Sequence, residues 1–223
     1  MDRAVMGIKC VIFDLDGTLS DSAILTMSAF DKIAPLKGLP VPSLEDVRRT
    51  TGYATPEFYF RLLPQFNKEL VLEAGSLVEE EELNVLPSVA ENLLFPGCRQ
   101  MLSHLKKKSI DLHIASTGER KHVFSILEET GITDLFDTVF CGNPDKTESV
   151  REIITRYEKD ECVLVGDMKK DFDAAHANGI ISIGACYGYC KPELSEFDFY
   201  IDAPLDLLDV LKKIEAEPFS KLC

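Results

Sequence analysis

The sequence lacks the features that mark membrane-spanning and secreted proteins. No apolar run approaches the roughly 18 residues that a membrane-spanning helix needs. The N-terminal MDRAVMGIKC has none of the long apolar run of a signal peptide. The seven cysteines are an odd number and include no Cys-x-x-Cys pair. This usage is typical of reduced thiols, so we expect a cytoplasmic protein.

Basic residues are also scarce. Lys and Arg number 24 against 38 Asp and Glu, which gives a net charge of −14. Nucleic acids and acidic membrane surfaces are polyanions, so this balance argues against both as partners. A small anionic substrate remains compatible with it, because one metal ion and one lysine can reverse the field locally.

The chain alternates short β-rich apolar runs with helical patterns. Its 223 residues are 45% hydrophobic, enough for a packed core. One helical pattern is Val150, Ile153, Ile154 and Tyr157, which follow i, i+3, i+4, i+7. The alternation predicts an α/β fold: a doubly wound, mostly parallel Rossmann-like sheet covered on both faces. The strand candidates are residues 9–14, 110–116, 137–141, 161–167, 180–185 and, shorter, 199–201.

The stretch 19–89 interrupts this alternation. It is helical in pattern and contains no convincing strand. We therefore predict a small helical domain at 19–89, inserted into a Rossmann-like core made of residues 1–18 and 90–223. The acidic run at 79–82 in this insert is interpreted as a solvated helix face.

Polar residues follow four of the predicted strands. Because the carboxyl ends of the strands in a doubly wound sheet share one crevice, we expect these residues to meet there. They are two carboxylates after the first strand, two hydroxyls after the second, a lysine after the third and two carboxylates after the fourth: Asp14, Asp16, Ser116, Thr117, Lys146, Asp167 and Asp171.

Four carboxylates cannot share a crevice unaided. Two unit charges 4 Å apart repel by about 4 kcal/mol at an effective dielectric constant of about 20. A hard cation with oxygen ligands resolves this conflict, and Mg²⁺ suits carboxylates, waters and a phosphate oxygen. Serine and lysine can then hold the other phosphate oxygens, and a carboxylate can attack phosphorus. The alternative for Asp14 and Asp16 is a simple turn beside Gly17.

Four motifs in this order resemble the haloacid dehalogenase-like hydrolase superfamily. They are DLDGT at 14–18, AST at 115–117, the lone Lys146 and GDMKKD at 166–171. The surrounding sequence resembles the phosphoglycolate phosphatase-like branch. The resemblance extends over the core and is weaker across the insert, which matches the family's helical cap mainly by its position.

The resemblance implies a phosphoryl-transfer role for each matching residue. Asp14 would be the nucleophile that forms an aspartyl phosphate, and Asp16 the general acid and then the general base. Ser116 and the backbone N–H near Thr117 would bind phosphoryl oxygens, while Lys146 neutralises the phosphate and Asp14. Two alternatives stay open: Ser116 could only cap the next helix, and Lys146 could be an exposed residue at a helix start.

The resemblance also implies Mg²⁺ as the cofactor. Asp14, the backbone carbonyl of Asp16 and Asp167 would bind the metal, with Asp171 acting directly or through water. The alternatives are that Asp167 is an N-cap residue and that Asp171 only favours the helix dipole.

Substrate choice is expected to depend on the insert. Arg49 and Tyr53, in VRRTTGYATP, lie where related caps present a substrate-facing loop, although a solvated helix end is an equal alternative for the arginine. Gly118 stands where many phosphoglycolate-like relatives have a lysine, which weakens the case for phosphoglycolate. The histidines show no ligand spacing and are expected to be structural or at the surface: His104, His113, His122 and His176.

The sequence therefore predicts a Mg²⁺-dependent phosphatase acting on a small soluble phosphate ester. A phosphomutase of the β-phosphoglucomutase type is the main alternative because it shares this site, although such mutases often have valine in place of Thr18. A catalytically silent binding protein is less favoured, because no catalytic residue is lost. The pattern indicates neither the particular ester nor the oligomeric state.

Overall fold

A single parallel sheet forms the centre of the protein. The computed structural model describes residues 7–53, 55–189 and 196–216. Within these residues, six strands pair in parallel in the order β3-β2-β1-β4-β5-β6, which confirms the predicted fold class. The strands are β1 (Cys10–Phe13), β2 (Asp111–Ala115), β3 (Thr138–Phe140), β4 (Cys162–Gly166), β5 (Ile181–Ala185) and β6 (Phe199–Ile201).

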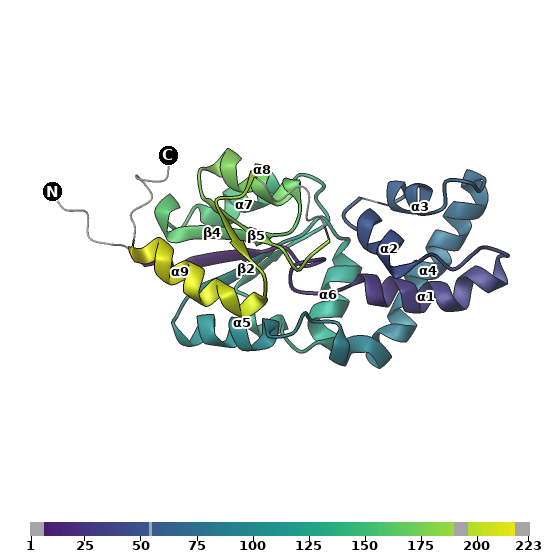
Figure 1. The fold of residues 1–223 in the computed structure, drawn as a ribbon, viewed down its shortest axis with the longest axis horizontal. Coiled ribbons are helices and arrows are strands. Elements are labelled where there is room, and N and C mark those ends of the chain that lie inside the picture. The colour runs from purple at the N-terminus through teal and green to yellow at the C-terminus, as the bar shows by residue number, and fades with distance from the viewer. Residues whose placement is uncertain (1–6, 54, 190–195, 217–223) are drawn as a thin grey trace.

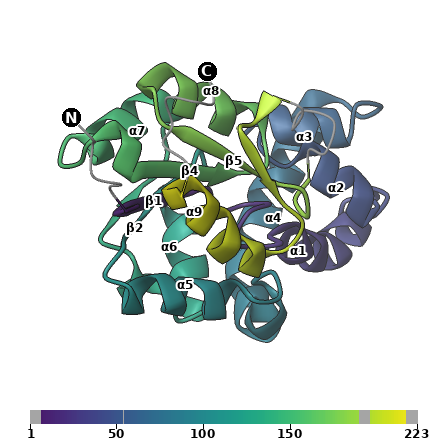
Figure 2. The same ribbon diagram turned by 60° about the vertical axis from the view of Figure 1, so that its left-hand side comes forward.

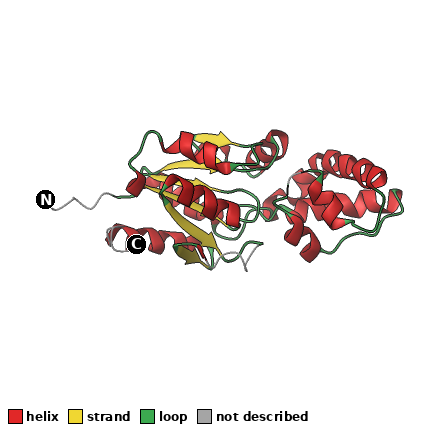
Figure 3. Ribbon diagram, turned by 90° about the horizontal axis from the view of Figure 1, so that it is seen from above, coloured by secondary structure: helices red, strands yellow, loops and turns green. Residues whose placement is uncertain are grey.

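Helices cover both faces of this sheet (Figure 3). On one face, Val11 and Phe13 of β1 pack with apolar residues of α5, α6 and α9. On the other face, Cys10 and Ile12 pack with α7 and α8. Successive residues of a strand point to opposite faces, so β1 is apolar throughout. The helices are α1 (Ala23–Leu36), α2 (Leu44–Thr50), α3 (Glu57–Leu62), α4 (Lys68–Val89), α5 (Cys98–Lys107), α6 (Arg120–Glu129), α7 (Lys146–Ile154), α8 (Lys169–Asn178) and α9 (Leu207–Ala216).

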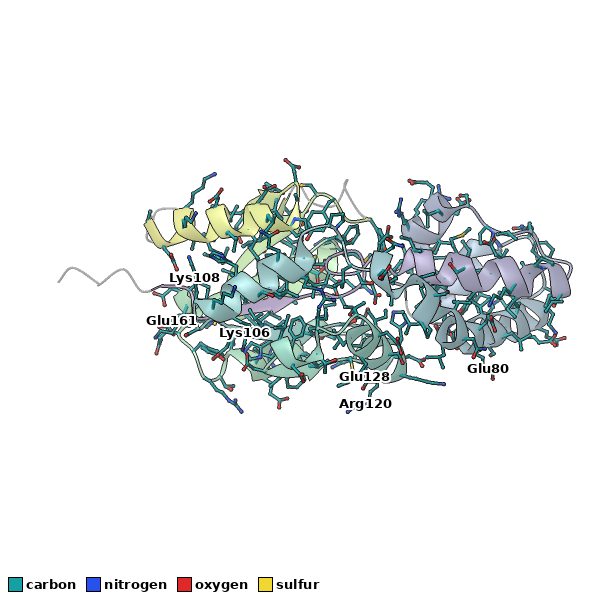
Figure 4. All side chains as sticks on the ribbon, turned by 90° about the horizontal axis from the view of Figure 1, so that it is seen from below. Glu80, Lys106, Lys108, Arg120, Glu128 and Glu161 are labelled. Atoms are coloured by element: carbon teal, nitrogen blue, oxygen red, sulfur yellow. The ribbon has the colours of Figure 1, made fainter. Side chains whose placement is uncertain are left out.

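The helices α1 to α4 lie together at one end of the sheet (Figures 1 and 2). They follow β1 in the chain and precede α5, and they pack around buried apolar side chains such as Phe30, Tyr59 and Val78. The labelled residues Lys106 and Glu161 lie at the opposite end of the molecule (Figure 4). The carboxyl ends of the strands therefore face this group of helices.

One detail of the sequence interpretation is wrong. The helical pattern that included Tyr157 ends earlier, because α7 stops at Ile154. The Tyr157 hydroxyl instead donates a hydrogen bond of 2.8 Å to Asp111 Oδ2 on β2, and its ring packs edge-on against His113. This polar anchor to the sheet takes Tyr157 out of the helix.

Among the helices in the described ranges, none has both the length and the apolar character needed to cross a membrane.

Candidate active site

A cavity of about 620 Å³ lies where the carboxyl ends of the strands meet α1 to α4. The core contributes Asp14, Asp16 and Lys146 to its walls, and the helical group contributes Tyr53 and Glu82. Residues that are far apart in the sequence thus border one cavity, at the crevice expected for a doubly wound sheet.

Three carboxylates gather beneath this cavity. Asp14, Asp167 and Asp171 are each at most 5% exposed, and one carboxylate oxygen from each lies within 4.8 Å of the others. Gly17, at φ +83°, allows this approach, because a Cβ at that position would lie only 2.4 Å from Asp167 Oδ2. Asp167 is held by the Tyr189 N–H at 2.8 Å and by Thr18 Oγ1 at 3.2 Å.

Lys146 inserts a positive charge into the carboxylate group. Its Nζ lies 2.7 Å from Asp14 Oδ1 and 2.7 Å from Asp171 Oδ1. Burial lowers the pKa of Lys146, but the two carboxylates outweigh burial and hold that pKa above its usual value. At 4% exposure, Lys146 is not the exposed lysine of the alternative interpretation.

The cluster still carries excess negative charge. Burial raises the pKa of Asp14 to about 7, with Lys146 opposing the shift and Asp171 adding to it. Burial also raises the pKa of Asp167 well above its usual value, and Asp14 and Asp171 reinforce this. Three buried carboxylates against one ammonium form the all-oxygen donor set that suits a hard divalent cation. The residues present therefore fit a Mg²⁺ site.

Asp16 turns away from this cluster. Its Oδ1 lies 3.0 Å from His122 Nε2, on the first turn of α6. Burial raises the pKa of Asp16, but the charge and hydrogen bond of His122 outweigh it and hold that pKa below its usual value. The opposite directions of the two side chains explain how Asp14 and Asp16 coexist two residues apart.

Ser116 and its neighbours complete the core side. Ser116 is buried, and its Oγ accepts a 3.0 Å hydrogen bond from the Gly118 N–H. The N-cap residue of α6 is Glu119 rather than Ser116, so the capping interpretation does not hold. Thr117 lines the cavity. Similarly, the N-cap of α8 is Met168, which removes that role from Asp167.

Comparisons with known proteins agree with this arrangement. Residues 11–185 match the model of the haloacid dehalogenase-like hydrolases. The chain belongs to this family. A phosphoglycolate phosphatase from Vibrio vulnificus is 30% identical over 221 residues, covering 92% of this chain and 96% of that protein. One from Synechococcus elongatus is 24% identical, with 93% and 99% covered. The protein is therefore an enzyme, and these relatives place it among the phosphoric monoester hydrolases.

Solved structures show the same fold. A haloacid dehalogenase-like hydrolase from Streptococcus pneumoniae has a TM-score of 0.76 at 23% identity, with 91% of this chain and 98% of that chain covered. A β-phosphoglucomutase from Clostridium difficile has a TM-score of 0.73 at 20% identity, with 94% and 97% covered. At these identities the likeness establishes the fold alone.

Of the two residues at 49 and 53 that the sequence predicted to bind substrate, only one lines the cavity. Tyr53 lines it, with the Arg61 guanidinium 4.1 Å above its ring. Arg49 does not reach it: its Nη2 lies 2.5 Å from Asp46 Oδ1, and its side chain is 72% exposed. Arg48 is bound to the Asp21 carboxylate. The arginine therefore follows the alternative interpretation of a solvated helix end.

Sequence reasoning missed two residues of the site. His122 was expected to be structural or at the surface, yet it contacts Asp16. Glu82 belongs to the acidic run interpreted as solvated, yet its side chain is only 12% exposed and its Oε2 lies 3.7 Å from His122 Nδ1. Helical spacing could have identified Glu82. It follows the buried Val78 by four residues, so it lies on the inward face of α4.

A lysine lies close to Gly118, the position where the resemblance led us to expect one. This is Lys121, three residues later, which lines the cavity. Arg120 instead lies at the outer edge of the molecule (Figure 4), with its guanidinium 4.3 Å from the centre of the Phe124 ring.

Proposed function

We propose that the protein is a Mg²⁺-dependent phosphatase that hydrolyses a small phosphate monoester through an aspartyl phosphate on Asp14. The observation that carries this proposal is the group of three buried carboxylates around Lys146, with Asp16 on another part of the same cavity wall. A nucleophile, a charge-neutralising ammonium and a separate acid–base group are the parts that phosphoryl transfer requires.

The metal site follows from the donors present. Asp14, Asp167 and Asp171 supply carboxylate oxygens, and the backbone carbonyl of Asp16 is the fourth ligand that we propose. Bound there, Mg²⁺ would neutralise charge on the phosphoryl group and on the attacking carboxylate.

In the reaction that we propose, Asp14 is the nucleophile and Asp16 transfers the protons. A carboxylate oxygen of Asp14 attacks phosphorus while the ester bond to the leaving oxygen breaks. Asp16, which is protonated as the negative charge of the bound ester raises its pKa, donates that proton to the leaving oxygen. In the second half, Asp16 takes a proton from water as the water attacks phosphorus, and the bond between Asp14 and phosphorus breaks. Inorganic phosphate and the free alcohol are the products.

The phosphoryl oxygens need donors that are already in place. Lys146 offers an ammonium beside Asp14, Ser116 offers a buried hydroxyl, and Thr117 offers a backbone N–H at the cavity wall. Such preorganised donors stabilise charge as it develops.

We propose that residues 1–18 and 90–223 form the catalytic core and that 19–89 form the cap. The cap closes the space above Asp14 and contributes Tyr53 and Glu82 to the cavity wall. Excluding water in this way would protect the aspartyl phosphate.

The substrate proposed is a small phosphate ester that fits within the cavity. The names of the relatives make 2-phosphoglycolate the first compound to test, followed by sugar phosphates and nucleoside monophosphates. The phosphomutase alternative predicts conversion of one sugar phosphate into an isomer without net release of phosphate.

The deciding experiment measures phosphate release from p-nitrophenyl phosphate with Mg²⁺ and with EDTA. We expect turnover that requires the metal and is abolished in Asp14→Asn. Asp173→Asn, a change of the same kind at an exposed position on α8, should retain activity. Turnover by a pure Asp14→Asn preparation that has not deamidated would disprove the mechanism.

A further inference from the structure

A chain of polar contacts connects the helical group to Asp16. Thr26 Oγ1 on α1 donates a 2.6 Å hydrogen bond to Glu82 Oε1 on α4. Glu82 Oε2 lies 3.7 Å from Nδ1 of His122, whose Nε2 lies 3.0 Å from Asp16 Oδ1. Each ring nitrogen of His122 therefore faces a carboxylate, one from α4 and one from the loop after β1.

This contact engages one of the two carboxylate oxygens of Asp16. Oδ1 is occupied by His122, and a hydrogen bond from Ser22 also reaches the carboxylate. Oδ2 lies on the side of the phosphate-binding residues: a Cβ built on Gly118 would be 3.3 Å from it and 3.2 Å from Ser116 Oγ. The Asp16 oxygen that does not contact His122 thus lies on the side of Ser116.

The burial of this contact sets it apart from a surface ion pair. The side chains of His122 and Asp16 are 25% and 16% exposed. His176 and Asp198 form a similar pair at 3.2 Å, but at 45% and 26% exposure, and Asp198 is further engaged by Ser182. The second pair lies outside the cavity and provides a matched control.

We propose that His122 is a positioning residue that orients the Asp16 carboxyl group toward the leaving oxygen, and that Glu82 ties this orientation to the cap. The inference rests on the proposed function, because it assigns a task within that reaction. Glu82 and Thr26 belong to the helices that cover the cavity, so the acid–base group is held in place where cap and core meet. A carboxyl group that rotates freely would protonate the leaving oxygen less often.

Leaving-group dependence tests this role. A general acid matters most for a basic leaving group, so the test compares kcat/KM for p-nitrophenyl phosphate with kcat/KM for phenyl phosphate, whose leaving phenol is the more basic. General acid catalysis contributes about 10²–10⁴-fold. For His122→Ala we expect a loss on phenyl phosphate about tenfold larger than on p-nitrophenyl phosphate.

Two further test variants and two control variants complete the design. His122→Gln, which keeps an N–H donor, should recover part of the lost activity on phenyl phosphate. Glu82→Gln should show the same selectivity with a smaller loss, and it keeps the test valid if His122→Ala does not fold. His176→Gln and Glu81→Gln are the controls for side-chain type and for charge on α4, and both should behave as the wild type.

The outcomes separate the two proposals. If the wild type hydrolyses neither ester, the proposed function fails and this inference fails with it. If the wild type hydrolyses both esters but folded His122 and Glu82 variants lose the two activities equally, or lose neither, only the positioning role is overturned.

Discussion

The sheet and the group of helices α1 to α4 in this hydrolase differ in how their charged side chains are buried. In the core, Lys146 is 4% exposed and lies 2.7 Å from each of two carboxylates. In the group α1 to α4, Lys32 is 58% exposed and pairs with Glu81, which joins α1 to α4. Exposed pairs are solvated and contribute little to stability, whereas buried charges depend on their partners. The difference shows that the charges needed for chemistry are concentrated at the ends of the strands.

The helix α4 combines both patterns in adjacent residues. Glu81 pairs with Lys32 of α1 at 2.7 Å, while Glu82 Oε2 lies 3.7 Å from His122 Nδ1, although the two side chains are similarly exposed, at 18% and 12%. Successive helical residues differ by about 100°, so one acidic run serves two environments. The partner that each carboxylate faces, rather than membership of the run, decides its role.

The largest expected effect is the loss of the buried lysine, compared with the loss of an exposed lysine that is also paired with a carboxylate. Lys146→Gln leaves Asp14 and Asp171 without their ammonium, so we expect a loss of about 3–5 kcal/mol in the metal-free unfolding free energy. Activity on p-nitrophenyl phosphate should be abolished. Lys32→Gln should leave both unchanged. Urea unfolding and the phosphatase assay measure the contrast, and equal effects of the two variants would contradict it.

The affinity of the buried carboxylates for Mg²⁺ should depend on pH. Because the pKa of Asp14 is raised to about 7 without metal, Mg²⁺ must displace a proton below that pH. Above it the carboxylate is already ionised. We therefore expect the Mg²⁺ Kd to rise about tenfold per pH unit below about pH 7 for each proton displaced, and Asp167, whose pKa is also raised, to add to this dependence. Isothermal titration at several pH values measures this, and a constant Kd down to pH 6 would refute it.

Removing one buried carboxylate should stabilise the metal-free protein. The pKa of Asp167 is raised by burial, so at neutral pH its ionised form disfavours the folded state. Asp167→Asn should increase Tm without Mg²⁺ by about 2–4 °C, the shift that about 1 kcal/mol produces in a chain of this size. This gain should disappear as the pH falls and the wild-type carboxyl group becomes protonated.

The same variant should lose the increase in Tm that Mg²⁺ gives the wild type, because one ligand is missing. Asp173→Asn, on the exposed side of α8, should match the wild type with and without Mg²⁺. An Asp167→Asn protein that is still stabilised by Mg²⁺ would exclude Asp167 from the metal site.

The contrast between regions also explains what the sequence could predict. The strands and their polar ends were predictable, because apolar runs mark buried strands and parallel strands end at one edge. The direction of the Asp16 side chain was not, since it depends on His122 of α6. The role of Glu82 was not recognised, because charge dominated the interpretation of its run and helical spacing was not applied to it.

The smallest expected effect concerns the arginine predicted to bind substrate. Arg48 and Arg49 are adjacent in the sequence, and only the packing of α2 decides which way each points. Arg49 pairs with Asp46 at the surface, so Arg49→Gln should change kcat/KM by no more than about twofold. Tyr53→Ala removes a side chain from the cavity wall and should raise KM for a substrate that fills the cavity. Steady-state kinetics of the two variants test this expectation. A larger loss of kcat/KM for Arg49→Gln than for Tyr53→Ala would mean that the helices α1 to α4 rearrange on binding and bring Arg49 to the ester.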